Sequence, residues 1–257
     1  MRTVHATRYV TPLREGGSLP AIVEGDDDGL YVLKFVGAGQ GPRALIAELV
    51  AGEIGRALGL PVPEIVFATI DADLARTEPD AEIQDLLLAS EGTNLGLDFL
   101  PGALPFSPAA GPAPDPGFAA EVVWLDELVT NVDRTARNPN LLVWHGRIWL
   151  IDHGAALYWH HGSARPPDAR KPFPQIRDHV LLPFASMLDD VDKALSAALT
   201  AEKIDAIASL IPDEWLADDA HVDKAAQRAA YSRYLTRRLE APRAFAEEAE
   251  RARSLHV

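Results

Sequence analysis

The sequence contains no cysteine. Disulfide bonds, thiolate nucleophiles, and zinc or iron–sulfur sites ligated by cysteine are therefore excluded. Basic residues are scarce: 24 Lys and Arg stand against 38 Asp and Glu, which gives a formal net charge of −14. A nucleic-acid partner is not expected, because neutralising phosphates requires clustered Lys and Arg.

Long apolar runs are also missing. No stretch reaches the ~18 uncharged apolar residues of a membrane span, and the first residues, MRTVHATRYV, lack the apolar core of a signal peptide. We therefore expect a cytoplasmic protein without a membrane partner. Hydrophobic residues nevertheless make up 47% of the 257 positions, enough for a substantial core.

The first hundred residues predict strands around one long helix. The turn DDDG joins two apolar runs, Ala21–Glu24 and Leu30–Val36, which indicates a hairpin. Apolar residues recur at helical spacing over Pro42–Leu58, and Gly59 follows the expected helix end. Further strands are expected at Pro63–Ile70 and Asn94–Leu100, and a short helix at Ala81–Ala89.

The composition changes after residue 100. Residues 101–117 hold six of the 20 prolines, which indicates an irregular connection between two lobes. Beyond it helices dominate, with one hairpin formed by Leu141–Val143 and Ile148–Ile151. The helices are expected at Phe118–Thr130, Met187–Leu199, Ala201–Leu210 and His221–Arg251. The predicted fold class is α+β, with a small strand-rich lobe joined to a larger helical lobe.

Three polar residues near the hairpin indicate phosphoryl transfer. Asp133 and Asn138 lie five apart in a loop after a helix, and Asp152 ends the hairpin 14 residues later. Phosphoryl transfer needs a carboxylate to orient or deprotonate the acceptor hydroxyl, and oxygen ligands that hold Mg²⁺ on the nucleotide phosphates. Asp and Asn in loops often only cap turns. The helix before them and the hairpin after them favour the functional interpretation, with Asp133 as the first group and Asn138 and Asp152 as the second.

This order of D-x4-N, hairpin and Asp-x-Gly resembles the protein-kinase-like superfamily. Within it, IDHGAALYWHH resembles the HipA-like kinases of bacteria. The resemblance covers most of residues 10 to 190, while the C-terminal helices match only loosely. It implies ATP and Mg²⁺ as cofactors and a two-lobed kinase-like fold. The N-lobe would span 1–100, the hinge connection 101–117 and the helical C-lobe with the catalytic loop 118–257.

The resemblance extends to the expected nucleotide site. In YVLKF, Lys34 takes the place of the ATP-binding lysine, and Val32 shares its strand face, where it would cover the adenine. The other implied nucleotide contacts are a turn between the first two strands, Gly16, Gly17 and Ser18, and a hinge strand, Asp98, Phe99 and Leu100.

A glutamate on the long helix should pair with Lys34. The family spacing selects Glu48, which completes a catalytic set with Lys34 and Asp133. Helical periodicity does not select it, because Glu48 shares a face with small residues such as Ala51, whereas Glu53 lies among bulky ones. Glu53 therefore stays the alternative.

The chain departs from the kinase pattern in three places. The first two strands are not joined by a G-x-G-x-x-G loop, and no His-Arg precedes Asp133. The second absence is expected in the HipA-like branch. The third departure is the helix glutamate, because the family spacing selects Glu48 and helical periodicity does not. Within IDHGAALYWHH, His153 stands where other kinases have Phe or Trp.

Other sites are less well supported. The glycines Gly37, Gly39 and Gly41 form G-x-G-x-G and not the G-x-G-x-x-G of dinucleotide-binding folds. Four histidines between His145 and His161 lack the spacing of a zinc site. The sequence has neither a Walker A motif nor the G-x-S-x-G of Ser hydrolases.

The predicted function is an ATP- and Mg²⁺-dependent phosphotransferase whose acceptor is a Ser or Thr hydroxyl of a protein. One alternative is a small-molecule kinase similar to aminoglycoside phosphotransferases, which share the same D-x4-N and Asp arrangement. Another is a nucleotide-binding pseudokinase that serves as an interaction module. A pseudokinase has no need of Asp133, so its presence beside Asn138, Asp152 and Lys34 favours catalysis.

Overall fold

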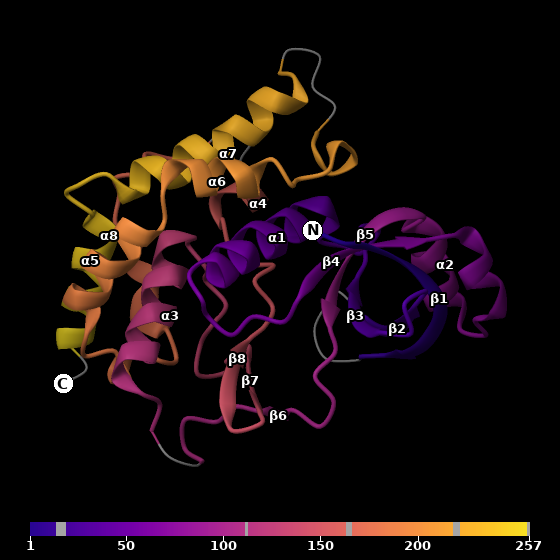
Figure 1. Cartoon of the computed structure of the whole chain (residues 1–257), viewed down its shortest axis with the longest axis horizontal. Helices are drawn as coiled ribbons and strands as arrows, with labels where there is room; N and C mark the ends of the chain where they lie inside the picture. The colour runs from indigo at the N-terminus through magenta and orange to yellow at the C-terminus, as the bar shows by residue number, and fades with distance from the viewer. Residues whose placement is uncertain (14–18, 111–112, 163–165, 218–221, 256–257) are drawn as a thin grey trace.

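A strand-rich N-terminal region lies beside a helical C-terminal region in the computed structural model (Figure 1). The structure describes residues 1–13, 19–110, 113–162, 166–217 and 222–255. This arrangement confirms the predicted α+β class and the two-lobed architecture.

The N-terminal strands close into a barrel in the order β1-β2-β3-β5-β4, in which β1 and β4 pair in parallel. Alternate residues point inward, so that Tyr31 and Leu33 of β3 are buried in the barrel core while Val32 and Lys34 lie on its outer face. The strands are β1 (Thr3–Pro12), β2 (Ala21–Gly25), β3 (Leu30–Lys34), β4 (Ile65–Ile70) and β5 (Gly92–Asp98).

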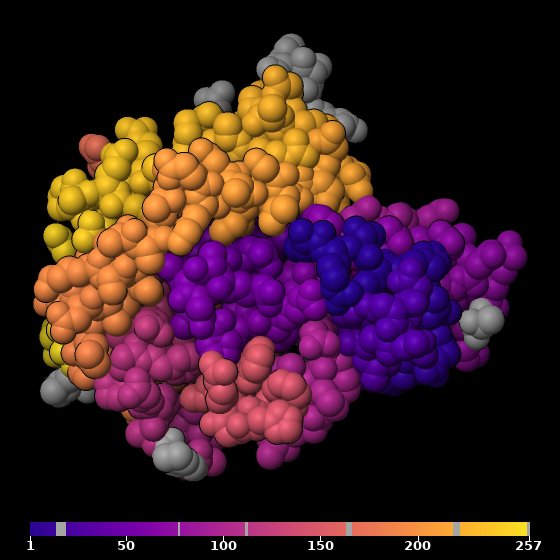
Figure 2. Space-filling model, viewed as in Figure 1, coloured from indigo at the N-terminus to yellow at the C-terminus, as the bar shows by residue number. Residues whose placement is uncertain are grey.

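Helix α1 (Gly41–Ala57) is buried on all sides, as a helix with apolar residues around its whole circumference must be. Its residues belong to a core that continues into the C-terminal helices and is distinct from the barrel core. In Figure 2 the violet surface of α1 and the segment after it lies between the orange C-terminal helices and the pink hairpin. The helix therefore connects the two lobes.

The remaining elements lie outside the barrel and α1. The helices are α2 (Ala81–Ala89), α3 (Pro116–Leu128), α4 (Trp159–Gly162), α5 (Leu188–Ala198), α6 (Ala201–Ala208), α7 (Lys224–Leu239) and α8 (Ala244–Ser254). Strands β6 (Leu104–Pro105), β7 (Leu141–Trp144) and β8 (Arg147–Leu150) form a small sheet. Short 3₁₀ turns occur at Ala72–Thr77, Pro174–Asp178, Leu182–Phe184 and Asp213–Trp215.

Most of the expected elements form within two residues of their predicted bounds, but the single helix expected over His221–Arg251 is wrong. The chain forms α7 and α8 there, separated by a turn that contains Pro242. Proline lacks a backbone N–H and its ring clashes with the preceding helical turn, so a helix cannot run through this position undisturbed. The helical spacing of residues over this stretch does not by itself show the break that Pro242 causes.

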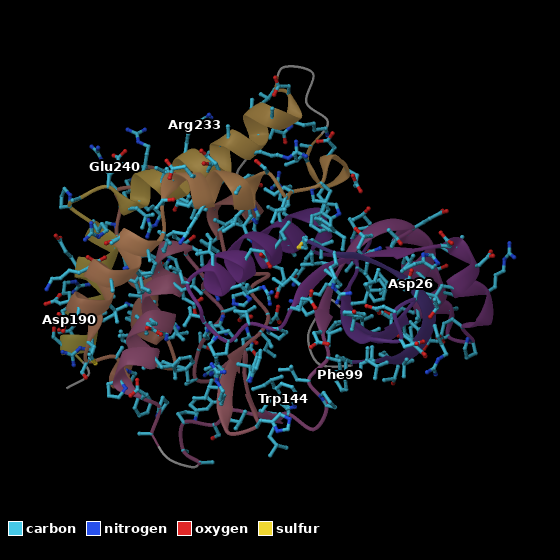
Figure 3. All side chains as sticks on the ribbon, in the orientation of Figure 1. Asp26, Phe99, Trp144, Asp190, Arg233 and Glu240 are labelled. Atoms are coloured by element: carbon cyan, nitrogen blue, oxygen red, sulfur yellow. The ribbon has the colours of Figure 1, made fainter. Side chains whose placement is uncertain are left out.

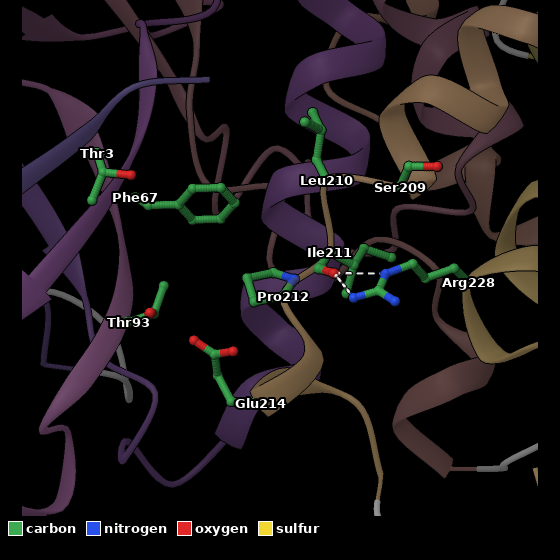
Figure 4. Close-up of a pocket in the computed structure, with 9 residues that line it drawn as sticks. All are labelled: Thr3, Phe67, Thr93, Ser209, Leu210, Ile211, Pro212, Glu214 and Arg228. Atoms are coloured by element: carbon green, nitrogen blue, oxygen red, sulfur yellow. Dashed lines mark hydrogen bonds between the residues drawn. The ribbon is translucent and has the colours of Figure 1, made fainter. Parts of the chain in front are cut away.

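The C-terminal region returns to the N-terminal barrel through Trp215. Its ring packs edge-on against Phe67 of β4, with 5.8 Å between ring centroids, and its Nε1 donates a hydrogen bond of 3.0 Å to the Thr93 carbonyl of β5. Figure 4 shows the neighbouring pocket of about 320 Å³, in which Phe67 and Thr93 face Pro212 and Glu214. The lobes are therefore joined at this contact as well as through the connection after β5.

Replacing Trp215 by alanine should test this second junction. Trp215 is 2% exposed, so Trp215→Ala should lower the free energy of unfolding by about 3–5 kcal/mol, the usual cost of removing a large buried aromatic side chain. Tyr158 is 53% exposed, and Tyr158→Ala should change stability by no more than about 0.5 kcal/mol. If chemical denaturation showed the same small loss of unfolding free energy for Trp215→Ala as for Tyr158→Ala, the junction would contribute little to stability.

His160 of α4 is a second link between distant elements. Its side chain is 2% exposed, and its Nδ1 lies 3.1 Å from the Tyr231 hydroxyl of α7. Arg43 of α1 donates a hydrogen bond of 2.6 Å to the His160 carbonyl. Burial, together with the neighbouring charges of His161 and Arg43, lowers the pKa of His160 to about 3. The imidazole is therefore neutral at pH 7.

This burial predicts a pH-dependent stability. The pKa of His160 is 6.5 when unperturbed and about 3 in the folded protein. As the pH falls below 6.5, the unfolded chain takes up a proton that the folded protein does not, so stability decreases with a slope of about 1.4 kcal/mol per pH unit from this residue. His160→Asn should flatten the slope of unfolding free energy between pH 6.5 and 4 by about that amount. An unchanged slope would contradict the assignment.

Candidate active site

Lys34 lies between two carboxylates from distant parts of the chain. Its Nζ is 2.5 Å from Oε2 of Glu48 on α1 and 2.6 Å from Oδ1 of Asp152, which follows β8. The Glu48 side chain is fully buried, the Lys34 side chain is 13% exposed, and that of Asp152 is 49% exposed. Glu53 instead pairs with Arg56 at 3.1 Å. Of the two candidate glutamates, Glu48 is the one that contacts Lys34.

The charges of this group stabilise one another against burial. Burial by itself would lower the pKa of Lys34, but Glu48 and Asp152 outweigh it and raise that pKa above its ordinary value. Burial would likewise raise the pKa of Glu48, but Lys34 and His153 outweigh it and lower the pKa to about 2. Lys34 and Glu48 are therefore both ionised at neutral pH.

The small residues of α1 explain why Glu48 reaches this position. A Cβ atom added to Gly154 would lie 3.8 Å from the Cβ of Ala44, and one added to Gly52 would lie 2.5 Å from Cδ1 of Ile65. The face of α1 that carries Glu48 therefore contacts the segment after β8 at Ala44 and packs closely against Ile65 of β4 at Gly52. A larger residue at Gly52 would require its neighbours to move.

Asp133 is held in place by its loop. Its Oδ2 accepts hydrogen bonds from Nδ2 of Asn138 at 2.8 Å and from Nδ2 of Asn140 at 3.2 Å. Its backbone N–H donates to Oδ1 of Asn131 at 3.1 Å. Because Asn138 donates through its side-chain nitrogen Nδ2, its side-chain oxygen Oδ1 is left to accept a hydrogen bond or to bind a metal ion.

A buried ion pair fixes the backbone of the same loop. Arg134, whose side chain is fully buried, binds Oδ2 of Asp126 on α3 through Nε at 2.5 Å. Its Nη1 also donates to the carbonyl of Asn140 and, at 3.2 Å, to that of Ile151. Since Ile151 precedes Asp152, Arg134 connects the loop that carries Asp133 to the residue that contacts Lys34.

Two further residues complete the buried network around Asp126. His179 contacts its Oδ2 at 2.9 Å through Nε2, and Asn131 donates to its Oδ1 at 3.0 Å. The Leu181 N–H donates to Nδ1 of His179, so Nε2 carries the hydrogen. Burial would raise the pKa of Asp126, but Arg134 and His179 outweigh it and hold that pKa well below its ordinary range.

Asp126, Arg134 and His179 are functional residues that the sequence patterns did not predict. The available signal was an acidic residue, Asp126, within the apolar run VVWLDELV, since a charge on a buried helix needs a partner. Nothing in the sequence names that partner.

Asp152 has a strained backbone, with φ of +55°. Residues other than glycine rarely adopt this left-handed conformation, and where they do it is often at a functional site. The turn of the chain at Asp152 lies two residues after the end of β8 and directs the side chain toward Lys34.

The expected nucleotide residues lie on the barrel side of this group. Val32 is on the same outer face of β3 as Lys34. In the hinge, Asp98 and Phe99 already donate their backbone N–H groups to the carbonyls of Glu64 and Leu30. The Leu100 N–H has no acceptor among the described residues. Gly16, Gly17 and Ser18 lie outside the described residues.

The β7–β8 hairpin is attached to the hinge. Nε1 of Trp144 donates a hydrogen bond of 3.0 Å to the Pro101 carbonyl, and its ring packs edge-on against Trp149 at 5.4 Å. Figure 3 labels Trp144 and Phe99 at the lower edge of the molecule, where the hairpin and the hinge approach each other. This contact holds the hinge beside the hairpin whose second strand, β8, leads to Asp152.

The alternative sites find no support in the geometry. Strand β3, which precedes Gly37, Gly39 and Gly41, pairs only antiparallel with its neighbours, unlike the parallel strands of a dinucleotide-binding unit. Within the described ranges, no three His, Asp or Glu side chains form a metal-binding group. No helix in the described part of the chain is long and apolar enough to span a membrane.

A second pocket, of about 500 Å³, lies between the proline-rich connection and the β7–β8 hairpin. Neither it nor the pocket of Figure 4 includes Lys34, Glu48, Asp133 or Asp152. These pockets are therefore separate from the candidate active site.

Comparison with known proteins agrees with this fold. The crystal structure of the Helicobacter pylori proinflammatory kinase CtkA is similar, with a TM-score of 0.54 and 15% sequence identity over 93% of this chain and 95% of that chain. At this identity the likeness shows the fold alone. A search of curated proteins gives no match. The family model for HipA-like kinases matches residues 7–244, which includes the C-terminal helices up to the start of α8. The chain therefore belongs to the HipA-like kinase family.

Proposed function

We propose that the protein is an ATP- and Mg²⁺-dependent phosphotransferase that phosphorylates a Ser or Thr hydroxyl of a protein. The observation that carries this proposal is the group Lys34–Glu48–Asp152, joined through Arg134 and Ile151 to the loop that holds Asp133. It combines a fixed cation for phosphate oxygens with a carboxylate for the acceptor hydroxyl, and phosphoryl transfer requires both.

ATP would bind between the barrel and the β7–β8 hairpin. The free N–H of Leu100 is a donor for the adenine edge, with Asp98 and Phe99 beside it, and Val32 would cover the ring. Lys34 would contact the phosphates, and Gly16, Gly17 and Ser18, which lie outside the described residues, are expected to cover them. Because Glu48 and Asp152 hold Lys34 before the nucleotide arrives, the cation needs little reorganisation on binding.

The donor set fits Mg²⁺. The second carboxylate oxygen of Asp152 and the side-chain oxygen Oδ1 of Asn138 are hard ligands without a protein partner in the described structure. Mg²⁺ prefers one or two such protein oxygens together with phosphate oxygens and water. When bound, the ion would neutralise charge on the transferred phosphoryl group.

Asp133 would act on the acceptor. The two asparagines that donate to its Oδ2 leave Oδ1 to accept a hydrogen bond from the substrate hydroxyl. As the acceptor oxygen bonds to the γ-phosphorus and the bond to the β–γ bridging oxygen breaks, the hydroxyl proton passes to Asp133. The pairing of Thr135 with His179 brings the segment before α5 beside this loop, where a protein acceptor would lie.

Removing the metal ligand should uncouple Mg²⁺ from ATP binding. A ligand that binds only the folded state raises stability by RT ln(1 + [L]/Kd), so ATP should raise the melting temperature more with Mg²⁺ than without it. Asp152→Asn should remove most of that Mg²⁺-dependent increment. A mutant that keeps the full increment would rule out Asp152 as a metal ligand.

Asp133→Asn should separate an enzyme from a pseudokinase. The substitution keeps the size of the side chain and removes its charge and basicity. Mg-ATP binding by calorimetry should stay near that of the wild type, while phosphoryl transfer falls on the order of 10²-fold or more, as for loss of a general base. A pseudokinase would show binding and no turnover in either protein. Equal turnover in the two proteins would remove Asp133 from the catalytic set.

A further inference from the structure

His153 is buried beside Glu48, and the proposed reaction assigns it no part. Its side chain is fully buried, and its Nδ1 lies 3.4 Å from Oε1 of Glu48. The other oxygen of the same carboxylate, Oε2, receives Nζ of Lys34. Each oxygen of Glu48 therefore has its own partner, one from β3 and one from the segment after β8.

The direction of the hydrogen bond follows from the charges. Glu48 is ionised, since its pKa lies near 2, and an ionised carboxylate only accepts hydrogen bonds. Nδ1 of His153 must then carry the hydrogen. Nε2 is buried and has no partner in the described structure, so a hydrogen there would be an unsatisfied buried donor. Both nitrogens favour the tautomer with the hydrogen on Nδ1.

We propose that His153 is a positioning residue that orients the Glu48 carboxylate toward Lys34 through its Nδ1–H. This inference rests on the proposed function, because its consequence is a fixed Lys34 for the ATP phosphates. A carboxylate held at one oxygen can still rotate about its last side-chain bond, whereas one held at both oxygens is fixed. The result is a chain of four side chains, His153–Glu48–Lys34–Asp152, that begins and ends on neighbouring residues.

The packing around His153 supports this role. Gly52 lies on the face of α1 that is turned toward the imidazole, and a Cβ atom built on Gly52 would be 3.9 Å from Nδ1 of His153. The same Cβ would lie 2.5 Å from Ile65, so the space is tight and the ring has little freedom. A Phe or Trp at position 153 would fill this space with a ring but provide no donor for Oε1 of Glu48.

The tautomer can be measured directly on the wild-type protein without nucleotide. Long-range ¹H–¹⁵N correlation spectra distinguish a protonated from an unprotonated ring nitrogen, and comparison with His153→Phe assigns the His153 signals. A protonated Nδ1 is expected. An unprotonated Nδ1 would overturn the proposal, because the hydrogen bond to Glu48 would then have no hydrogen.

Three substitutions test the consequence for nucleotide binding. His153→Asn places an amide donor near the Nδ1 position, His153→Gln places it near Nε2, and His153→Phe keeps only a ring. With Mg-ATP as the probe in calorimetry, His153→Phe and His153→Gln should raise Kd about tenfold, as expected for a lost hydrogen bond to a charged group. His153→Asn should keep the Kd for Mg-ATP within about twofold of the wild-type value. A merely structural role for His153 predicts no rescue by Asn.

A matched control is His160→Asn, which alters another buried histidine, one whose Nδ1 lies beside the Tyr231 hydroxyl instead of Glu48. Its Kd for Mg-ATP should equal that of the wild type. If His153→Phe binds Mg-ATP as tightly as the wild type, or if His153→Asn binds it no better than His153→Phe, the positioning role is wrong while the proposed function stands. If the wild type does not bind Mg-ATP, the proposed function fails, and the ¹H–¹⁵N measurement still decides the role of His153.

Discussion

The ammonium group of Lys34 is the constraint on which the rest of the site depends. A charge on the outer face of a barrel strand that becomes largely buried must be paired, because an isolated buried charge is too costly to keep. The two carboxylates that pair with it lie 14 and 118 positions away in the chain. The ion pairs can form only when β3, α1 and the end of β8 have all taken their places. The ion pairs of Lys34 with Glu48 and Asp152 therefore form only in a protein in which both lobes are assembled.

A second buried ion pair has the same effect on the catalytic loop. Asp126 and Arg134 are both fully buried, and Arg134 also binds the two carbonyls that flank the β7–β8 hairpin. Breaking such a pair leaves an uncompensated charge in the interior. The loop of Asp133 is thereby held against the residue before Asp152, and the two polar networks meet at that point.

Helix α1 carries Glu48 between the lobes and is enclosed by them. The C-terminal helices cover it on the outside, and Trp215 attaches their connection to the barrel. Arg43 and His160 add a contact from its first turn. These contacts oppose a swing of α1 away from Lys34. The C-terminal helices, which the family model includes up to the start of α8, thus contribute to the geometry of the site.

Local patterns in the sequence determined the order of strands and helices and selected Asp133, Asn138 and Asp152 as candidates, while the resemblance to the kinase family added Lys34 and Glu48. Alternation, turn residues and helix ends act over a few positions, so they can be read from a single chain. Only the tertiary structure decided that Glu48 and not Glu53 meets Lys34, because a helix that is apolar all round does not show which side faces the barrel. The same holds for Asp126 and His179, which are 53 positions apart. Burial makes a partner necessary for such residues, but which residue becomes the partner depends on how distant segments pack.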